Sequence, residues 1–408
     1  MRQPIRVIGT RVLVLLCLLA TACNGGDDPV ACGAPPAVAE ANCSTTGSCD
    51  AIQIAGDAPD VNPGTFKGFA DPSLASDPDV AGRVWLAYTW PHVVAGQACN
   101  GSAVQMAAAE NRLARSDDGG MTFTHVGTLW PDVAMPDPEG SCEIGRISSE
   151  TASLASIASA GQSTWYGAHL RYFLRPQTGY NPKYATSWHV RIGAAASPAG
   201  LASASETVLG VSTTAAVYLP NVRLDQLAGL PIQHCAILNN PTLFTRNQTL
   251  YLVVECLAFI GTTPDYVNTS MQVFATNPSG VPTSWTWRHA GKLADHALAT
   301  QLGNDTILQP DVSLAADGTP IALFTPAHID TSFQVGTVGD GCVAIELASI
   351  DPPALARDCA GNPVIRRRVT GTGVGACTHD RNSATGIVAT SQDASGGNWM
   401  IRASELRP

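Results

Sequence analysis

The chain has 408 residues and a formal net charge of −10, with 45% hydrophobic and 14% charged residues. This apolar content is sufficient for a large core and excludes global disorder. Because acidic residues outnumber basic ones by 33 to 23, no basic surface is expected and nucleic acid is excluded as a partner.

The N-terminus has the pattern of a secretory signal. Arginines precede an apolar run over residues 12–19, which is too short to span a bilayer, and small residues lead up to Cys23. Small residues followed by cysteine resemble the lipobox of bacterial lipoproteins, which implies that Cys23 carries lipid. The alternative is an ordinary signal cut near Ala22. We expect a signal over 1–22, a flexible Gly- and Pro-rich tether over 23–50 and one domain over 51–408.

Ten of the 12 cysteines lie beyond Cys23. An even number in an exported chain predicts up to five disulfides. Close spacing favours the pairs Cys99–Cys142 and Cys342–Cys359. No CxxC spacing indicates a metal site, so we expect neither a metal nor another cofactor.

Five segments of the domain share one pattern, in which a small or apolar strand, a turn and a strand rich in aromatic or aliphatic residues follow one another. The second strands align on Trp85, Trp165, Tyr251, Ile321 and Trp399. In the fifth segment this alignment places the first strand at 383–387. Further β-type segments follow at 104–107, 189–192, 271–274 and 342–345.

A meander of four strands per repeat predicts an all-β fold, a β-propeller. We predict five blades, or six if the insertions at 173–187 and 201–234 contain another. The fifth repeat is short, so the N-terminal stretch around 51–54 is expected to complete it. Such strand exchange closes the ring and removes edge strands.

Residues 116–123, Ser-Asp-Asp-Gly-Gly-Met-Thr-Phe, match the Asp-box pattern Ser-x-Asp-x-Gly-x-Thr-Trp/Phe. The chain therefore resembles the sialidase and Asp-box (BNR-repeat) β-propeller superfamily. That resemblance implies a structural turn between the third and fourth strands of a blade, on the face opposite the functional site. Its carboxylate accepts N–H groups of the turn and its glycine permits an unusual φ. The motif residues are Ser116, Asp118, Gly120, Thr122 and Phe123.

Polar residues gather where the inner strands of the predicted blades begin. Glycoside hydrolysis needs two carboxyl groups at a defined separation. Asp71 and Glu150 open neighbouring inner strands and form the predicted catalytic pair, with Asp311 as another possible partner. The predicted substrate-binding residues are Arg146, Arg171, Tyr172, Asn240, His379 and Arg381. Alternatively, such residues only solvate the axial channel or tie neighbouring blades together.

Two families of glycosidases resemble this arrangement in different ways. Sialidases grip a carboxylate with three arginines, and Arg146, Arg171 and Arg381 are the best candidates here, although the family's first-arginine motif is absent. Five-bladed arabinanase and fructosidase-type enzymes carry acids at their first three inner strands. The third position here is Asn239-Asn240.

The leading interpretation is a sialidase-like β-propeller lipoprotein of the bacterial cell envelope, tethered to the membrane by lipid. As an enzyme it would be a monomeric glycoside hydrolase acting on glycans outside the cytoplasm. The alternative is a non-catalytic propeller that binds a glycan or a protein with the same polar face.

Overall fold

The computed structural model describes residues 37–61, 66–138, 140–159, 161–176, 186–209, 211–212, 222–223, 227–228, 235, 237–260, 263–330, 336–393 and 397–408. Strands make up nearly all of its regular structure, and the described part contains one α-helix, α1 (His296–Leu302). The all-β prediction is confirmed. The predicted signal and Cys23 lie outside the described residues. Among the helices of the described part, none has the length and apolar character needed to cross a membrane.

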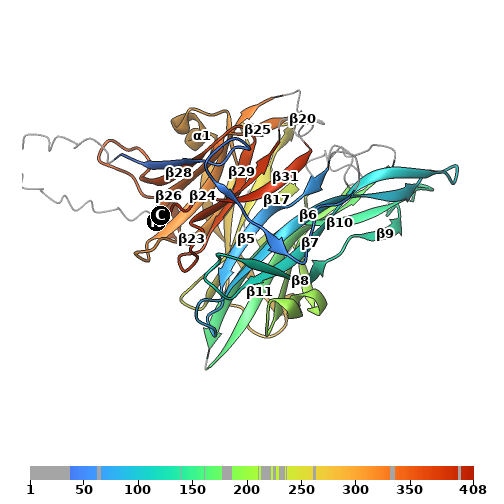
Figure 1. The fold of residues 1–408 in the computed structure, drawn as a ribbon, viewed down its shortest axis with the longest axis horizontal. Coiled ribbons are helices and arrows are strands. Elements are labelled where there is room, and N and C mark those ends of the chain that lie inside the picture. The colour runs from blue at the N-terminus through green and yellow to red at the C-terminus, as the bar shows by residue number, and fades with distance from the viewer. Residues whose placement is uncertain are drawn as a thin grey trace, which may run out of the picture. The chain divides into compact units, whose positions relative to one another are not determined.

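The strands form five antiparallel sets that follow one another along the chain (Figure 1). Set one is β5 (Ala70–Ser76), β6 (Val84–Gln97), β7 (Ala103–Ser116) and β8 (Phe123–Trp130). Set two is β10 (Ile144–Ser159), β11 (Gln162–Leu174), β12 (Thr186–Ala195) and β13 (Glu206–Leu209). Set three is β17 (Ile237–Arg246), β18 (Thr249–Leu257), β21 (Ser270–Thr276) and β22 (Trp287–Asp295). Set four is β23 (Thr306–Leu314), β24 (Pro320–Ile329), β26 (Gly341–Ile350) and β28 (Ile365–Thr370). Set five is β29 (Val374–His379), β30 (Ile387–Gln392) and β31 (Asn398–Ala403).

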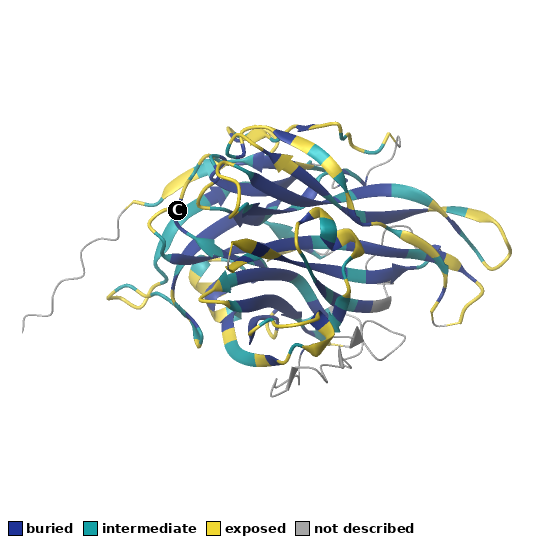
Figure 2. Cartoon of the chain, turned by 90° about the horizontal axis from the view of Figure 1, so that it is seen from below, coloured by how far each residue is buried: buried dark blue, intermediate teal, exposed yellow. Residues whose placement is uncertain are grey.

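Hydrogen bonds join the first strand of each set to the first strand of the next, and join set five to set one. These bonds are Leu154 N to Ser73 Oγ (3.1 Å), Leu243 N to Ser153 Oγ (2.9 Å), Thr242 Oγ1 to Pro310 O (2.7 Å), His379 N to Asp311 Oδ2 (3.3 Å) and Leu74 N to Thr378 Oγ1 (3.2 Å). Apolar side chains pack between neighbouring sets in five clusters, so the core lies between the sheets. Figure 2 shows buried residues along the middle of the strands and exposed residues at the ends of the hairpins.

The N-terminal part of the described chain crosses the outer strands of three sets. We call residues 39–55 the strap. Its strand β1 (Ala39–Asn42) pairs with β28, β2 (Asp50–Ala51) pairs with β31, and β3 (Ile54–Ala55) pairs with β8. β2 thus gives set five a fourth strand from the region where the sequence predicts one. The segment expected to be a tether up to residue 50 is therefore structured from residue 39.

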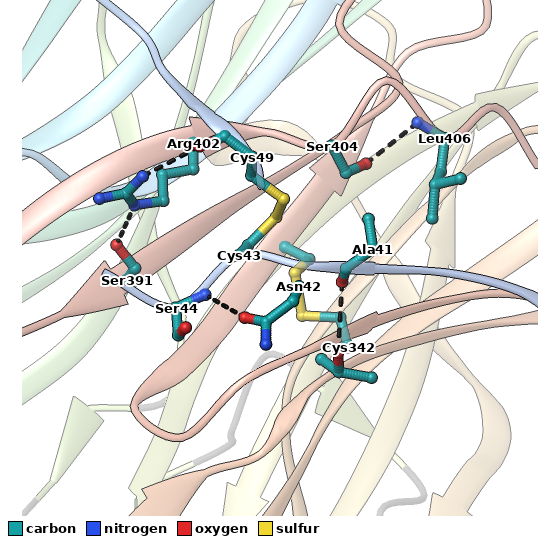
Figure 3. Close-up of a disulfide and its surroundings, with 12 residues drawn as sticks. Ala41, Asn42, Cys43, Ser44, Cys49, Cys342, Ser391, Arg402, Ser404 and Leu406 are labelled. Carbon is teal, nitrogen blue, oxygen red and sulfur yellow. Dashed lines mark hydrogen bonds between the residues drawn. A yellow bond between two sulfur atoms is a disulfide. The ribbon is translucent and has the colours of Figure 1, made fainter. Parts of the chain in front are cut away.

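A buried arginine holds the strap to set five, and a disulfide closes a loop within the strap (Figure 3). Cys43 and Cys49 are disulfide-bonded between β1 and β2. The Arg402 guanidinium, 9% exposed, donates to the carbonyl of Cys49 at 2.9 Å and to the Ser391 hydroxyl at 2.9 Å. A buried guanidinium needs such acceptors, because an unpaired buried charge is costly.

The predicted boundaries of the fifth repeat are wrong by one strand. Its first strand is β29 (Val374–His379), and residues 383–386 belong to the turn before β30. Trp399 lies in β31, the third strand of the set. The second strand carries no aromatic residue, so the alignment on aromatic positions selected the next strand instead.

The structure confirms one of the two favoured disulfides and corrects the other. Cys99 is bonded to Cys142, whereas Cys342 is bonded to Cys377 rather than to Cys359. Cys342 is near the start of β26, and this strand carries the chain roughly 25 Å away before the turn that contains Cys359. Cys377 lies in β29, beside the start of β26, with a Cα–Cα distance of 6.3 Å to Cys342.

The turn over residues 116–123 connects β7 to β8, the third and fourth strands of set one. Asp118 Oδ1 accepts from the Thr122 N–H at 3.0 Å, and Asp118 Oδ2 accepts from the Thr122 hydroxyl at 2.6 Å. Gly120 N donates to Ser116 Oγ at 2.7 Å, and Phe123 is buried. The hydrogen bonds that Asp118 accepts, from the Thr122 and Ser116 side chains and from the Thr122 N–H, lower its pKa to about 2. Asp118 and Thr122 are exposed, so the carboxylate organises a surface turn.

Replacing Asp118 by Ala is expected to lower the free energy of unfolding by about 1 kcal/mol or less, because the freed N–H can reach water. The contribution is present above the unfolded-state pKa and is lost as the pH falls toward about 2. Urea midpoints at neutral and acidic pH measure it. The exposed neighbour Asp117 is the control, and Asp117→Ala should change the midpoint less. An Asp118→Ala loss that persists at the lowest pH would contradict this account.

Candidate active site

The first strand of every set bends at the same point. Each strand shifts register there against its second strand, and the residue at the bend has a left-handed backbone. The five bend residues are Asp71 (φ 46°), Thr151 (φ 51°), Asn240 (φ 45°), Gln309 (φ 48°) and Ala376 (φ 47°). Non-glycine residues adopt such φ values rarely, and strained positions of this kind cluster at functional sites.

The five bend residues line one cavity of about 40 Å³ between the first strands. A water molecule needs ~10–15 Å³ of such space, so the cavity has room for a few waters and none for a sugar ring. A sugar would therefore lie outside this cavity. Glu150 and Asn239 directly precede two of the bends, so they lie on the side from which the first strands begin.

Asp71 and Glu150 are brought together by the packing of β5 against β10. Both residues are partly buried, and burial of its carboxyl group raises the pKa of Asp71 to about 6. Burial, and then the negative charge of Asp71, raise the pKa of Glu150 to about 8. Two neighbouring carboxyls with separated pKa values can act as an acid and a base at neutral pH.

The side chains that hold this pair come from second strands. Tyr172 in β11 is hydrogen-bonded to Glu150. Its ring is buried and stacked on Trp188, with centroids 4.6 Å apart. Thr89 in β6 is hydrogen-bonded to Asp71, and its hydroxyl accepts from Thr151 N at 3.0 Å. Tyr172, a predicted ligand contact, thus lies at the site as a partner of Glu150.

A third buried acid, Glu255 in β18, was not predicted from the sequence. It is 1% exposed and accepts from Asn240 Nδ2 at 2.7 Å and from Asn239 Nδ2 at 3.2 Å. Burial raises its pKa to about 7. The start of β17 carries Asn239-Asn240, and the acid that contacts both asparagines lies on the neighbouring strand. Only the pairing register of β17 and β18, which places Asn239 opposite Glu255, reveals this.

Asp311 occupies a different position from Asp71 and Glu150. It lies two residues after its bend and accepts from His379 N at 3.3 Å, as Ser73 and Ser153 accept from the strands beside them. Burial raises its pKa to about 6, opposed by the hydrogen bond from Thr378. Asp311 is thus partly buried and ties β23 to β29 through this hydrogen bond.

The three predicted arginines do not converge. Arg146 is paired with Asp132, which also receives His92 Nε2 at 3.2 Å. Arg171 follows Leu170 and precedes Tyr172 in β11, so its side chain is on the opposite face from Tyr172. Burial, and then the charge of Arg191, lower the pKa of Arg171.

His379 and Arg381 lie at the other end of the first strands, where β29 ends. They line a second cavity, of about 150 Å³, with the residues that follow the bends. The loop beyond Arg381 reaches the 116–123 turn, because Ala384 N donates to Gly119 O at 2.7 Å. His379 is 1% exposed and its Nδ1 donates to Gly386 O at 3.2 Å, so it is a core residue. The shifted fifth repeat explains why both were misplaced.

No family model matches the chain, and no curated protein matches it. Solved structures that match include a family 117 glycoside hydrolase from the marine bacterium Zobellia galactanivorans, with 11% identity, a TM-score of 0.45 and coverage of 88% of this chain and 90% of that one. Sucrose-6-phosphate hydrolase from Lactobacillus gasseri matches with 11% identity, a TM-score of 0.45 and coverage of 87% and 60%. An α-L-arabinanase from Cellvibrio cellulosa matches with 8% identity, a TM-score of 0.35 and coverage of 73% and 76%. Similarity this weak assigns neither a reaction nor a substrate to the chain.

Replacing Glu150 by Gln is expected to stabilise the fold at alkaline pH. Below the unfolded-state pKa of Glu150, both the folded and the unfolded wild type are protonated at this residue. Between that pKa and about 8, only the unfolded state ionises, so the free energy of unfolding of the wild type falls as the pH rises. The advantage of Gln should therefore grow between about pH 4.5 and about pH 8, to the order of a few kcal/mol.

Unfolding midpoints of the wild type and the variant across this range measure the difference. Asp132→Asn is the matched control with the opposite sign. Burial raises the pKa of Asp132, but the hydrogen bonds and charges of His92 and Arg146 outweigh it and lower this pKa. Asp132→Asn should therefore cost stability at neutral pH and cost less in acid. If the difference in unfolding midpoint between Glu150→Gln and the wild type does not depend on pH, the pKa of Glu150 is not raised in the folded protein.

Proposed function

We propose that the five sets are the blades of a five-bladed β-propeller. The support is the set of hydrogen bonds that leads from each first strand to the next and from set five back to set one. The strap supplies the outer strand of set five and closes the ring between the first and last blades. Closure of this kind leaves no exposed sheet edge at the seam.

On this propeller we propose a glycoside hydrolase site at Asp71 and Glu150. The observation that carries the proposal is the pair of neighbouring, partly buried carboxyls whose pKa values differ. Glu150, protonated at neutral pH, donates its proton to the glycosidic oxygen as the bond to the leaving group breaks. The Asp71 carboxylate serves as base for the attacking water or as nucleophile. Tyr172 orients the Glu150 carboxyl through their hydrogen bond.

Hydrolysis of a panel of 4-nitrophenyl glycosides tests the proposal. Release of nitrophenol from at least one neutral glycoside by the wild-type protein, and not by Glu150→Gln, is expected. Sialosides should not be preferred, because the described residues do not assemble the arginine trio that grips a carboxylate. If the wild type turns over no glycoside but binds glycans on an array, the propeller is a binding module instead.

We also propose that the protein is anchored in the bacterial cell envelope through a lipid on Cys23, on the strength of the sequence pattern alone. Cys23→Ala should then move the protein from the membrane pellet to the soluble fraction after cell fractionation. It should also leave a precursor that is uncleaved or cleaved elsewhere. Equal membrane association of the variant and the wild type would exclude the lipid anchor.

A further inference from the structure

Glu255 occupies a position at which three other second strands carry threonine. The equivalent residues, each opposite the residue before a bend, are Thr89, Thr325 and Thr390. Each threonine hydroxyl accepts the N–H of the bend residue in the next set: Thr151 N at 3.0 Å, Ala376 N at 3.0 Å and Asp71 N at 2.9 Å. Glu255 accepts the Gln309 N–H in the same way. A threonine would be sufficient for this bond, so the carboxylate must be explained by its other contacts.

The additional contacts of Glu255 are the side-chain amides of Asn239 and Asn240. Both Nδ2 atoms lie within hydrogen-bond distance of the same oxygen, Oε2. An ionised carboxylate has only acceptors, so each carboxamide must turn its NH₂ toward Glu255 and its Oδ1 away from it. Asn240 is one of the residues that line the axial cavity.

We propose that Glu255 is a positioning residue that turns the Asn240 carboxamide so that its Oδ1 accepts a hydroxyl of the sugar bound over the axial cavity. This inference rests on the proposed glycoside hydrolase function. Protonation of Glu255 removes the negative charge to which both carboxamides donate, and a hydrogen bond to a neutral carboxyl is weaker than one to a carboxylate. The two NH₂ groups are therefore held less firmly when Glu255 is protonated.

Tyr266 is the titratable group in electrostatic contact with Glu255 in the described part of the chain. Its pKa is raised to about 12 by burial and then by the charge of Glu255. It stays neutral where Glu255 titrates. Asp71 and Glu150 titrate in the same pH range, so the experiment must separate their effects from that of Glu255.

Nuclear magnetic resonance of protein labelled with ¹⁵N at asparagine side chains tests the inference without a substrate. The NH₂ signals of Asn239 and Asn240 should shift between about pH 5 and about pH 9, with a midpoint near the Glu255 pKa of about 7. The shift should vanish in Glu255→Gln. Asn111, buried in set one beside Thr89, is the internal control and should not follow this midpoint. A shift that persists in Glu255→Gln arises from Asp71 or Glu150 and overturns the inference.

Glu255→Thr provides the matched functional variant, because threonine can retain the bond to Gln309 N. On a glycoside that the wild type hydrolyses, KM is expected to rise about 3- to 10-fold with little change in kcat, as for loss of one hydrogen bond. Adding Asn240→Ala should cause little further loss, since both changes remove the same acceptor. Additive losses overturn the inference. If no glycoside is hydrolysed, the hydrolase proposal fails, whereas the amide titration still decides whether Glu255 orients Asn240.

Discussion

Replacing Glu150 by Gln, or Asp71 by Asn, is expected to reduce glycoside turnover by about 10²–10⁴-fold, because each change removes a proton-transfer group. Binding of substrate should change far less, since the amides keep the shape of the carboxyls. Single-turnover rates and the substrate dissociation constant, measured separately, distinguish the two effects. The wild-type rate should be highest between about pH 6 and about pH 8, where Asp71 is ionised and Glu150 is protonated.

Asp311→Asn is the control for this prediction. Asp311 is also a partly buried acid with a raised pKa, but its carboxylate accepts the His379 N–H, and an asparagine carbonyl can do the same. Turnover by Asp311→Asn should therefore stay within a few-fold of the wild type. Loss comparable to that of Glu150→Gln would make Asp311 a member of the catalytic group and would contradict the assignment of its role to strand contact.

Removing the strap is expected to cause the largest loss of stability. A chain that starts after Ala55 lacks β1, β2 and β3, the Cys43–Cys49 disulfide and the buried Ile54, and it leaves Arg402 without the Cys49 carbonyl. The buried isoleucine contributes ~2 kcal/mol, and a buried guanidinium left without an acceptor costs ~1–3 kcal/mol more. The truncated chain should therefore lose several kcal/mol or fail to fold.

Guanidinium unfolding of the truncated and full-length proteins measures this loss. The double variant Cys43→Ala, Cys49→Ala removes the disulfide within the strap but keeps the strand pairing, so its unfolding midpoint should be intermediate. Arg402→Met removes the buried charge together with its donors and should cost less than the truncation. A truncated chain with the midpoint of the full-length protein would show that the strap is dispensable.

The sequence predicts the regular parts of this fold well, because the first four repeats each carry an aromatic or aliphatic second strand after a clear turn. The fifth repeat has its aromatic residue, Trp399, in the third strand, and this shifts the prediction by one strand. His379 and Arg381 were therefore placed at the wrong end of their strand. Glu255 could not be found from spacing, since its place in the site depends on the register between β17 and β18.

The bends also make the site sensitive to parts of the molecule that never approach a ligand. The Asp71 N–H is held by Thr390 in β30, β30 pairs with β31, and β31 carries the strap strand β2. The Glu150 carboxyl is instead supported by Tyr172, within its own set. On heating, fraying that begins at the chain's N-terminal end would reach Asp71 before Glu150. The two carboxyls would then lose their alignment while most of the sheets are still folded, so inactivation should precede melting.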